Sequence, residues 1–508
     1  MTLCCKDLFF YINNYTMSTE NKELGFVGLM KSFTRPFWIA SIMELFERWA
    51  WYGLFAVLAL YLTGSTDEGG LGLTHAERSE IMSYGTFILY LLPVLTGIIS
   101  DKIGYKISLI IAYSLLAIGY YFMGQVTSYT GVFLMFLVVA LGAAIFKPVA
   151  SAIVTKATDK SNSSFGFGVF YMMVNIGGFF GPLFSAKLRD EYGWSIVFLM
   201  ATTAILVNML IVLFLFKEPN REKSNIPFSE TLKKSLANIL EALSDKKLSL
   251  LLLVMVGFWL MFNQLFYTLP VFIEEWINTT PFYDAFHKIL PPIADFLKNK
   301  DGSINPEMIV NLDAFFIIIF QMIISTIILK WKPISAMMTG IIIAMIGIGV
   351  SFYTNNSLYT VLGILIFAIG EMTSNPKFSD YIAKISPKGK EALYMGTYFV
   401  PIAFANLLTK WVTGDLYTNM SDKVLLIRRE LTSRNIQLPE ITKDFTKNDF
   451  YDSAANKLQM TKDQMTTLIW NNYHPGNIWY IIAGIGLATV IGLLVYNATI
   501  GKNVSKEK

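Results

Sequence analysis

Charged residues are scarce in this chain. Asp, Glu, Lys and Arg account for 15% of the 508 residues, whereas hydrophobic residues account for 54%. Soluble chains carry about 25% charged residues. Apolar runs long enough to cross hydrocarbon recur along the whole length, so we expect a polytopic membrane protein surrounded by the lipid bilayer. The small net charge of +4 gives no reason to expect a nucleic-acid partner.

Cysteine and histidine are scarcer still. The two cysteines, Cys4 and Cys5, are adjacent, which excludes a disulfide framework and a cysteine-based metal site. The three histidines, His75, His287 and His474, fall in expected loops or near a helix end, so we expect no buried histidine relay. No paired nucleophile and base, metal-ligand cluster or phosphate-binding loop is visible. We therefore expect no metal, no cofactor and no enzyme activity.

The N-terminus carries no recognisable secretory signal. Its first sixteen residues contain a short apolar run that leads to no small-residue cleavage site. Met17 opens a more ordinary start, MSTENKE, which indicates an upstream extension of the reading frame.

Twelve segments have the length and hydrophobicity of membrane-spanning helices. They lie at 36–63, 77–100, 104–125, 130–155, 164–187, 194–217, 249–276, 308–331, 333–354, 357–384, 389–416 and 475–500. The charged linker 218–248 divides them six and six, which predicts an all-α membrane protein with six-helix bundles at 36–217 and 249–501. Two halves around a central cavity suggest alternating access, with a substrate site near the bilayer midplane. The loops 277–306 and 417–474 are long, and the second has the amphipathic spacing of a small helical cap.

Lysine and arginine set the expected orientation. Basic residues gather in the linker 218–248 and in alternate short loops on the same side, whereas the opposite loops 126–129 and 355–356 carry none. By the positive-inside rule, the linker, the N-terminal segment 1–35 and the tail 502–508 lie in the cytoplasm.

A charged turn joins the second and third expected spans. It reads Gly97-Ile-Ile-Ser-Asp101-Lys102-Ile-Gly104, with a glycine for close helix approach, an acid near a helix end and a cationic tight turn. An ordinary basic loop would rarely reproduce these four residues. The run resembles the Gly-x-x-x-Asp-Arg/Lys-x-Gly signature of the major facilitator superfamily. The resemblance implies that superfamily's fold and makes the four residues a cytoplasmic gate motif.

The first expected span contains three charges within five residues. On a helix they share one stripe, which comprises Glu44, Glu47, Arg48, Trp51, Tyr52 and Phe55. Bare charge that faces lipid is costly, so the stripe is expected to face a cavity or a neighbouring helix. Glu44 and Arg48, four residues apart, can pair, and Glu47 can take up or release a proton as burial and a nearby cation compete. The alternative is a static ion-pair knot that holds the helix in place.

Three further charges interrupt apolar spans. Lys147, in LGAAIFKPVAS, needs an acid from another helix, and Glu44 or Glu47 is the obvious candidate. The following proline would bend that helix beside a cavity, although a snorkelling lysine is the alternative. Glu371, in AIGEMTSNP, is a candidate for binding a substrate's amino group. Asp313 begins another span, and interfacial and functional interpretations of it are equally open.

Aromatic and amide side chains supply the other groups expected of a polar substrate cavity. Each alone is more often packing or part of an interfacial belt. Asn175 is the strongest candidate, because the glycines after it let helices close tightly. The full set is Tyr84, Tyr90, Tyr171, Asn175, Trp259, Gln264 and Trp411.

Five motifs together resemble those of the proton-dependent oligopeptide transporter (POT) family. ELFERWAWYG, at 44–53, is similar to Glu-x-x-Glu-Arg-Phe-x-Tyr-Tyr-Gly, and FYMMVNIG, at 170–177, to Phe-Tyr-x-x-Ile-Asn-x-Gly. FKPVAS around Lys147, FWLMFNQ at 258–264 and GEMTSNP around Glu371 complete the set in the family's order.

The resemblance implies secondary active transport of di- and tripeptides, driven by protons that move down their gradient. Proton coupling and salt-bridge exchange would fall to Glu44, Glu47, Arg48 and Lys147. Glu371 would bind the peptide amino terminus, and Asn175 and the tyrosines would hold backbone groups. The implied substrate-binding set is Tyr52, Tyr84, Tyr90, Lys147, Tyr171, Asn175, Trp259, Gln264 and Glu371. We also expect a monomer in the plasma membrane, as in a bacterial inner membrane.

Two residues depart from the family's pattern. Phe55 stands where an arginine is usual, and Asn263 stands where the motif of span 249–276 has a glutamate that takes part in proton coupling. Carboxylate recognition would then fall to Lys147 alone, and coupling to the acids of the first span and Asp313. These departures keep open a transporter of the same fold for an amino acid, a peptide-like metabolite or an anion, with altered or absent proton coupling. A receptor-like or scaffold protein is disfavoured, because unused buried charge only destabilises.

Overall fold

The computed structural model describes residues 26–159, 162–218, 228–299, 302–387 and 390–501. Met17, Cys4 and Cys5, most of the N-terminal segment 1–35, part of the linker 218–248 and the tail 502–508 lie outside these residues. Within the described ranges the regular secondary structure is helical, and β-pairing is limited to isolated β-bridges.

In the first group of helices, a proline in the first turn of α3 helps to start a 29-residue helix after Thr34. A capping box between Thr74 and Glu77 starts α4, and the Ser128 hydroxyl caps α7. The helices of this group are α2 (Phe26–Ser32), α3 (Arg35–Thr63), α4 (His75–Leu91), α5 (Pro93–Ile103), α6 (Tyr105–Met123), α7 (Tyr129–Ala157), α8 (Ser163–Tyr192) and α9 (Trp194–Leu210).

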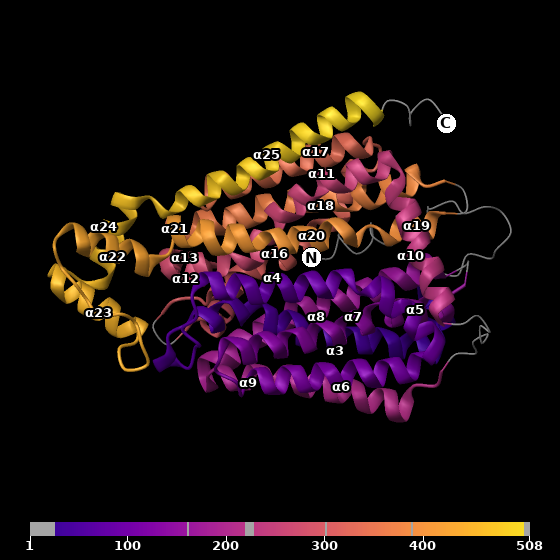
Figure 1. The fold of residues 1–508 in the computed structure, drawn as a ribbon, viewed down its shortest axis with the longest axis horizontal. Helices are drawn as coiled ribbons and strands as arrows, with labels where there is room; N and C mark the ends of the chain where they lie inside the picture. Colours follow the sequence, from indigo (N-terminus) through magenta and orange to yellow (C-terminus); the bar gives the residue numbers. More distant parts are fainter. Residues whose placement is uncertain (1–25, 160–161, 219–227, 300–301, 388–389, 502–508) are drawn as a thin grey trace.

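The second group runs from α11 to α25 and lies beside the first along the length of the molecule (Figure 1). Its members are α11 (Lys246–Tyr267), α12 (Leu269–Trp276), α15 (Pro306–Val310), α16 (Leu312–Ile328), α17 (Pro333–Ile346), α18 (Ser357–Ile385), α19 (Glu391–Gly396), α20 (Phe399–Lys410) and α25 (Ile478–Tyr496). Short π-helical segments extend α9, α17, α20 and α25. The core sits where helices of each group meet, and apolar side chains on the outer faces remain exposed for lipid.

Each of the twelve predicted spans falls on one helix or on consecutive helical segments of the described residues. Within the described residues, eight helices are long and apolar enough to cross a membrane, and the bent pair His75–Leu91 and Leu95–Ile103 makes a ninth. α3 is long enough but carries three charges near its middle, Pro333–Gly349 is shorter, and the predicted span 389–416 is divided among α19, α20 and the π-segment Trp411–Leu416. The chain is thus a multi-span, all-helical membrane protein.

Close packing between α3 and α8 depends on glycine. A Cβ added at Gly177 would lie 2.5 Å from the Leu45 carbonyl oxygen, and one at Gly181 would lie 2.6 Å from the Trp49 carbonyl oxygen. A side chain at either position would force the two helices apart, since real Cβ atoms do not approach that closely. The prediction that glycines after Asn175 let helices close tightly is confirmed for Gly177.

The loop after α20 folds as a small helical cap at one end of the molecule (Figure 1). It follows α21 (Tyr417–Met420) and contains α22 (Lys423–Ser433), α23 (Lys447–Leu458) and α24 (Lys462–Tyr473). Capping boxes at Thr446 and Thr461 start the last two, and apolar residues such as Phe450 and Ile469 are buried beneath them. We call residues 422–473 the cap and this end of the molecule the cap end. The shorter helices α13 (Thr280–Ile289) and α14 (Pro291–Leu297) lie in the other long loop.

The opposite end carries the amphipathic helix α10 (Phe228–Ser244), and we call it the linker end (Figure 1). α10 packs against α5 of the first group and α19 of the second. Its Glu241 forms an ion pair with Lys390, and just beyond it Asp245 accepts a hydrogen bond of 2.7 Å from the Tyr394 hydroxyl. The linker therefore packs against both groups and is bonded through these side chains to the second.

Candidate functional site

The three charges of α3 form a buried cluster. The Nε of Arg48 donates to Glu47 Oε2 at 2.6 Å and lies 3.3 Å from Glu44 Oε1. All three side chains are buried, and Glu47 is fully enclosed. The predicted pairing of Glu44 with Arg48 is therefore present, and the arginine is shared between two acids.

A cavity of about 420 Å³ lies between the two groups of helices. Its polar lining from the first group is Arg48, Tyr52, Thr86, Tyr90, Lys147, Tyr171 and Asn175. Its polar lining from the second group is Trp259, Asn263, Tyr267, Glu307, Asn311, Asp313, Glu371, Asn375, Tyr398 and Asn406. Seven of the nine predicted substrate-binding residues line this cavity, which suits a small polar ligand.

Lys147 does not pair with an acid of α3 as the sequence suggested. Its Nζ lies over the ring of Tyr90, 4.0 Å from the centroid, and no carboxylate of the described residues lies within 4.0 Å of it. Arg48 already occupies Glu44 and Glu47, so the lysine is held by a cation–π contact instead. Its ammonium lines the cavity without a carboxylate partner.

The two residues that depart from the POT pattern both line the cavity. Phe55 stacks on Trp51 with ring centroids 5.0 Å apart and meets the edge of Tyr267 at 5.5 Å. The amide nitrogen of Asn263 is buried without a hydrogen-bond partner among the described residues. Both departures therefore change the wall that a ligand would touch.

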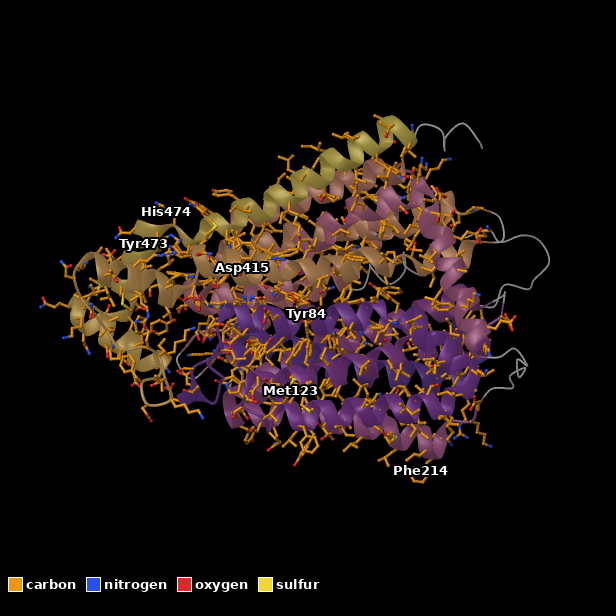
Figure 2. All side chains as sticks on the ribbon, viewed as in Figure 1. Tyr84, Met123, Phe214, Asp415, Tyr473 and His474 are labelled. Atoms are coloured by element: carbon orange, nitrogen blue, oxygen red, sulfur yellow. The ribbon has the colours of Figure 1, made fainter. Side chains whose placement is uncertain are left out.

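Two of the predicted substrate-binding residues lie elsewhere. Tyr84 is at the boundary between the two groups (Figure 2), where its hydroxyl is 3.3 Å from the Nζ of Lys410. Gln264 is fully buried and bonds within α11, to the Leu260 carbonyl and the Thr268 hydroxyl. Tyr84 and Gln264 are thus absent from the cavity lining, although other residues of α4 and α11 belong to it. The residue type alone does not show which face of a helix a side chain occupies. Trp411 is 57% exposed on the outer surface.

Three carboxyl groups of the second group line the cavity, and besides Glu307 they are those of Asp313 and Glu371. Asp313 is 4% exposed, and Glu371 lies on the neighbouring helix α18. One oxygen of each, Oδ1 of Asp313 and Oε2 of Glu371, is buried without a hydrogen-bond partner among the described residues.

The gate motif at the linker end has the geometry that its residue types suggest. A Cβ at Gly97 would lie 3.3 Å from the Cβ of Pro148 on α7, and Gly104 has a φ of +105° between α5 and α6, which favours glycine. Asp101 accepts a hydrogen bond of 3.0 Å from the Tyr105 hydroxyl. Lys102 follows Asp101 in the last turn of α5.

The cap end of the cavity is closed by contacts that the sequence analysis missed. Nη2 of Arg189 on α8 lies 3.2 Å from Oε1 of the buried Glu307 on α15, and the guanidinium also donates to Asn305 at 2.7 Å. Lys410 on α20 pairs with Glu80 on α4 at 2.7 Å. Both ion pairs join the first group to the second.

A chain of hydroxyl and amide groups crosses the cavity wall below these pairs. The Thr86 hydroxyl lies 2.7 Å from the Tyr267 hydroxyl, which donates to Asn406 Oδ1 at 2.6 Å. These residues come from α4, α11 and α20. Hydrogen bonds therefore link both groups of helices on the cap side of the cavity.

Glu275, at the end of α12, is the centre of a second network at the cap end. Its carboxylate lies 3.5 Å from His75 Nε2 and 3.1 Å from Lys447 Nζ and accepts from the Tyr417 hydroxyl at 2.8 Å. Lys423 donates to its carbonyl oxygen at 2.8 Å. His75, which the sequence places near a helix end, is 4% exposed because the second group covers the start of α4. The expected absence of a buried histidine relay stays a prediction.

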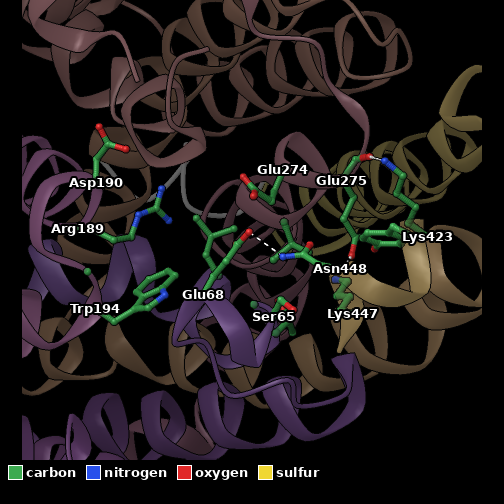
Figure 3. Close-up of a pocket in the computed structure, with 16 residues that line it drawn as sticks. Ser65, Glu68, Arg189, Asp190, Trp194, Glu274, Glu275, Lys423, Lys447 and Asn448 are labelled. Carbon is green, nitrogen blue, oxygen red and sulfur yellow. Dashed lines mark hydrogen bonds and ion pairs between the residues drawn. The ribbon is translucent and has the colours of Figure 1, made fainter. Parts of the chain in front are cut away.

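A charged pocket of about 390 Å³ lies beside this network, between both groups and the cap (Figure 3). Asn448 of the cap bonds to Asp67 and Glu68 of the first group at 2.9 and 2.8 Å. Burial lowers the pKa of Lys423 to about 8. Burial also acts against the charged form of Lys447, yet Tyr451 and Glu275 raise its pKa above the ordinary value. The cap is thus clamped to both groups.

A multi-span helical protein with a charged cavity between two groups of helices is built like a secondary transporter. The chain matches the model of the Major Facilitator Superfamily over residues 37–408. Because that match covers more than half of its length, the chain belongs to this superfamily.

Several known proteins similar to the chain are named as peptide transporters. Dipeptide and tripeptide permease A of Escherichia coli (strain K12) is 24% identical over 451 residues, which cover 78% of this chain and 88% of the permease. A crystal structure of peptide transporter POT in complex with sulfate superposes with a TM-score of 0.66 and 17% identity, over 92% of this chain and 95% of that chain. A POT family transporter in complex with 5-aminolevulinic acid gives a TM-score of 0.65 and 17% identity, over 92% and 96%.

These findings confirm the predicted fold class and the resemblance to the POT family. They also place the chain among membrane transporters and not among enzymes.

Proposed function

We propose that the chain is a proton-coupled symporter of di- and tripeptides that works by alternating access. One observation carries the proposal: the cavity presents a cation without a carboxylate partner from one group of helices and carboxyl groups from the other. Lys147 supplies the cation, and Glu371 and Asp313 supply the carboxyls. A peptide is a zwitterion, so it fits such a cavity with each end facing its opposite charge.

The roles of the lining residues follow from this polarity. Lys147 binds the peptide carboxylate, and Glu371 binds the amino terminus. Asn175 and Tyr171 hold backbone groups from α8, where the Asn175 amide already donates to the Tyr171 carbonyl at 2.9 Å. A peptide that bridges the two groups of helices favours closure around itself, because closure brings both charged ends to their partners at once.

Proton coupling depends on the shared arginine of α3. When Glu44 or Glu47 takes up a proton, Arg48 loses one of its two acid partners, and the other acid becomes its sole counter-ion. Lys147 lines the same cavity and competes for the carboxylate that is released. Proton binding thereby changes which charges are paired across the cavity, and a change of pairing favours one conformation over the other.

The conformation described here is closed at the cap end. We propose that this end faces outward and that the linker end, with both termini, faces the cytoplasm. Basic residues of the linker and of the alternate short loops support this orientation. The protein would then reside as a monomer in a bacterial inner membrane, with the two halves at 36–217 and 249–501 rocking about the cavity.

The test is uptake by purified protein in liposomes. Labelled dialanine or trialanine is supplied outside with an inward proton gradient, with and without an uncoupler. We expect accumulation above equilibrium for both peptides, and loss of accumulation when the uncoupler is present. Absence of accumulation for both, in vesicles that exchange another solute, would exclude peptide symport.

A transporter of another small polar solute is the second candidate. Phe55 and Asn263 favour it, because both cavity positions lack the charge that the POT pattern places there. Competition distinguishes the two candidates: excess unlabelled amino acid would block uptake of the true substrate only if amino acids bind the cavity. We expect dialanine to compete at least tenfold better than alanine.

A further inference from the structure

Asp313 and Glu371 stand out as acids of the cavity that have no cation beside them. They lie on α16 and α18, which pack against each other, and both line the cavity. Among the described residues that line the cavity, the cationic ones are Arg48 and Lys147, and both come from the other group of helices. Arg48 is already held between two acids of its own helix.

The surroundings of Asp313 supply no counter-ion. α18 contributes Glu371, and α8 contributes the phenol of Tyr171. Glu307, on the adjoining helix α15, is another acid, and Arg189 beside it is engaged with Glu307 and Asn305. Asn263 on α11 lines the same cavity, but an amide does not titrate.

Two carboxylates in one closed cavity are costly, because like charges repel and neither is fully solvated. The ammonium group of a peptide neutralises one of them. It has three donors, enough to bridge oxygens from both carboxyl groups, yet it carries one positive charge. A neutral arrangement needs one further positive charge, and a proton is the smallest that fits.

We propose that Asp313 and Glu371 form a two-carboxyl site that holds the substrate's ammonium group and one transported proton together. Asp313 is then the proton-carrying residue of the second group of helices. The proton adds to the Asp313 carboxylate from the outer solution and leaves from the same oxygen on the inner side. This inference rests on the proposed peptide transport and adds a place for the proton within the substrate cavity itself.

The test compares two assays on the same liposomes. Counterflow exchange of dialanine needs no gradient, whereas accumulation needs a coupled proton. A gradient of one pH unit supports about a tenfold accumulation for each proton. We expect Asp313→Asn to exchange dialanine at a reduced rate that varies less with pH, and to accumulate about tenfold less than the wild type at a gradient of one pH unit, because the proton on Asp313 is lost while the acids of α3 remain. Asp313→Glu, which keeps a carboxyl, should restore accumulation.

Asp380→Asn is the matched control, because Asp380 is an exposed acid on α18 that pairs with Lys384. It should leave both assays unchanged. Wild-type accumulation in the Asp313→Asn variant would overturn the inference, and so would an exchanging Asp313→Glu variant that fails to accumulate. If the wild type itself exchanges no dialanine, the proposed function fails, and the two-carboxyl site fails with it.

Discussion

Arg189 and Glu307 join the two groups of helices at the cap end of the cavity, with Nη2 and Oε1 3.2 Å apart. Glu307 is fully buried, so its charge depends on this arginine. The pair lies between α8 and α15, directly at the edge of the substrate cavity that Glu307 also lines. A conformational change that opens the cap end must separate these two side chains.

Removal of the arginine is expected to open the cap end. Arg189→Gln leaves Glu307 buried without its ion pair, and breaking such a pair costs about 3–5 kcal/mol. We expect a cysteine at the cavity position Val310 to react at least tenfold faster with an impermeant thiol reagent added from the cap side. Cys4 and Cys5 are first exchanged for serine.

Arg434→Gln is the control for the ion pair between Arg189 and Glu307. Arg434 pairs with Glu430 within the cap and is 43% exposed, so its loss should not change the labelling rate at Val310. Equal rates in the Arg189 variant and the wild type would show that the pair does not hold the cap end closed.

The ion pair between Lys447 and Glu275 is expected to hold the cap on the membrane domain. Glu275 is buried, so Lys447→Gln leaves a carboxylate with fewer partners and destabilises the docked cap by about 3 kcal/mol. A fluorophore on a cysteine at the exposed position Asn456 reports cap unfolding in urea. We expect a clearly lower urea midpoint for the variant.

Lys462→Gln removes an exposed pair with Asp452 and is the matched control. Exposed pairs contribute about 0–1 kcal/mol, so its midpoint should match the wild type. A Lys447 variant that is as stable as the Lys462 variant would contradict the clamp.

Lys423 gives the cap a pH dependence of stability. Burial lowers the pKa of Lys423 to about 8, so below pH 8 the lysine is charged in both states and the full cost of burying its charge is present. From pH 8 toward its ordinary value of about 10.4, the folded state binds fewer protons than the unfolded state, and stability rises with pH. We expect the urea midpoint to rise between pH 8 and 9.5. Lys423→Met should remove that rise, and an unchanged slope in this variant would exclude Lys423 as its source.

The glycines between α3 and α8 are expected to be essential for packing. At Gly181 an added Cβ would lie 2.6 Å from the Trp49 carbonyl oxygen, whereas at Gly168 nothing lies within 4 Å. Gly181→Ala should destabilise the protein by about 1–3 kcal/mol through overpacking, seen as a lower melting temperature in detergent. Gly168→Ala should have the melting temperature of the wild type or a slightly higher one. An equal loss of melting temperature in both variants would show that the backbone, and not overpacking, causes the effect.

Lys147 is expected to recognise the carboxylate of the substrate. Lys147→Ala should weaken dialanine binding by 2–5 kcal/mol, about 30-fold or more, because a buried carboxylate loses its charged partner. Alanyl-alaninamide, which lacks the carboxylate, should bind both forms similarly weakly. Counterflow KM values for the two compounds measure this, and an equal loss for both would assign Lys147 a structural role.

Several elements of this protein were predictable because their signals are local. The twelve spans follow from runs of about twenty apolar residues, and the pairing of Glu44 with Arg48 follows from their spacing of four on one helix. Gly104 of the gate motif was predictable because the chain turns sharply there between two helices, and glycine accepts the positive φ of that turn. Seven of the nine substrate-binding residues that the resemblance to the POT family implies line the cavity.

The sequence by itself determined that this chain is a helical membrane protein with charge placed inside the bilayer, because hydrophobic length and helical period are properties of neighbouring residues. Only the tertiary structure decided which charges of different helices meet. Arg189 finds Glu307 and His75 finds Glu275 across more than a hundred positions of the chain. Lys147 meets an aromatic ring because Arg48 already holds the acids of α3. Such partners depend on how whole helices pack, and one helix alone does not contain that information.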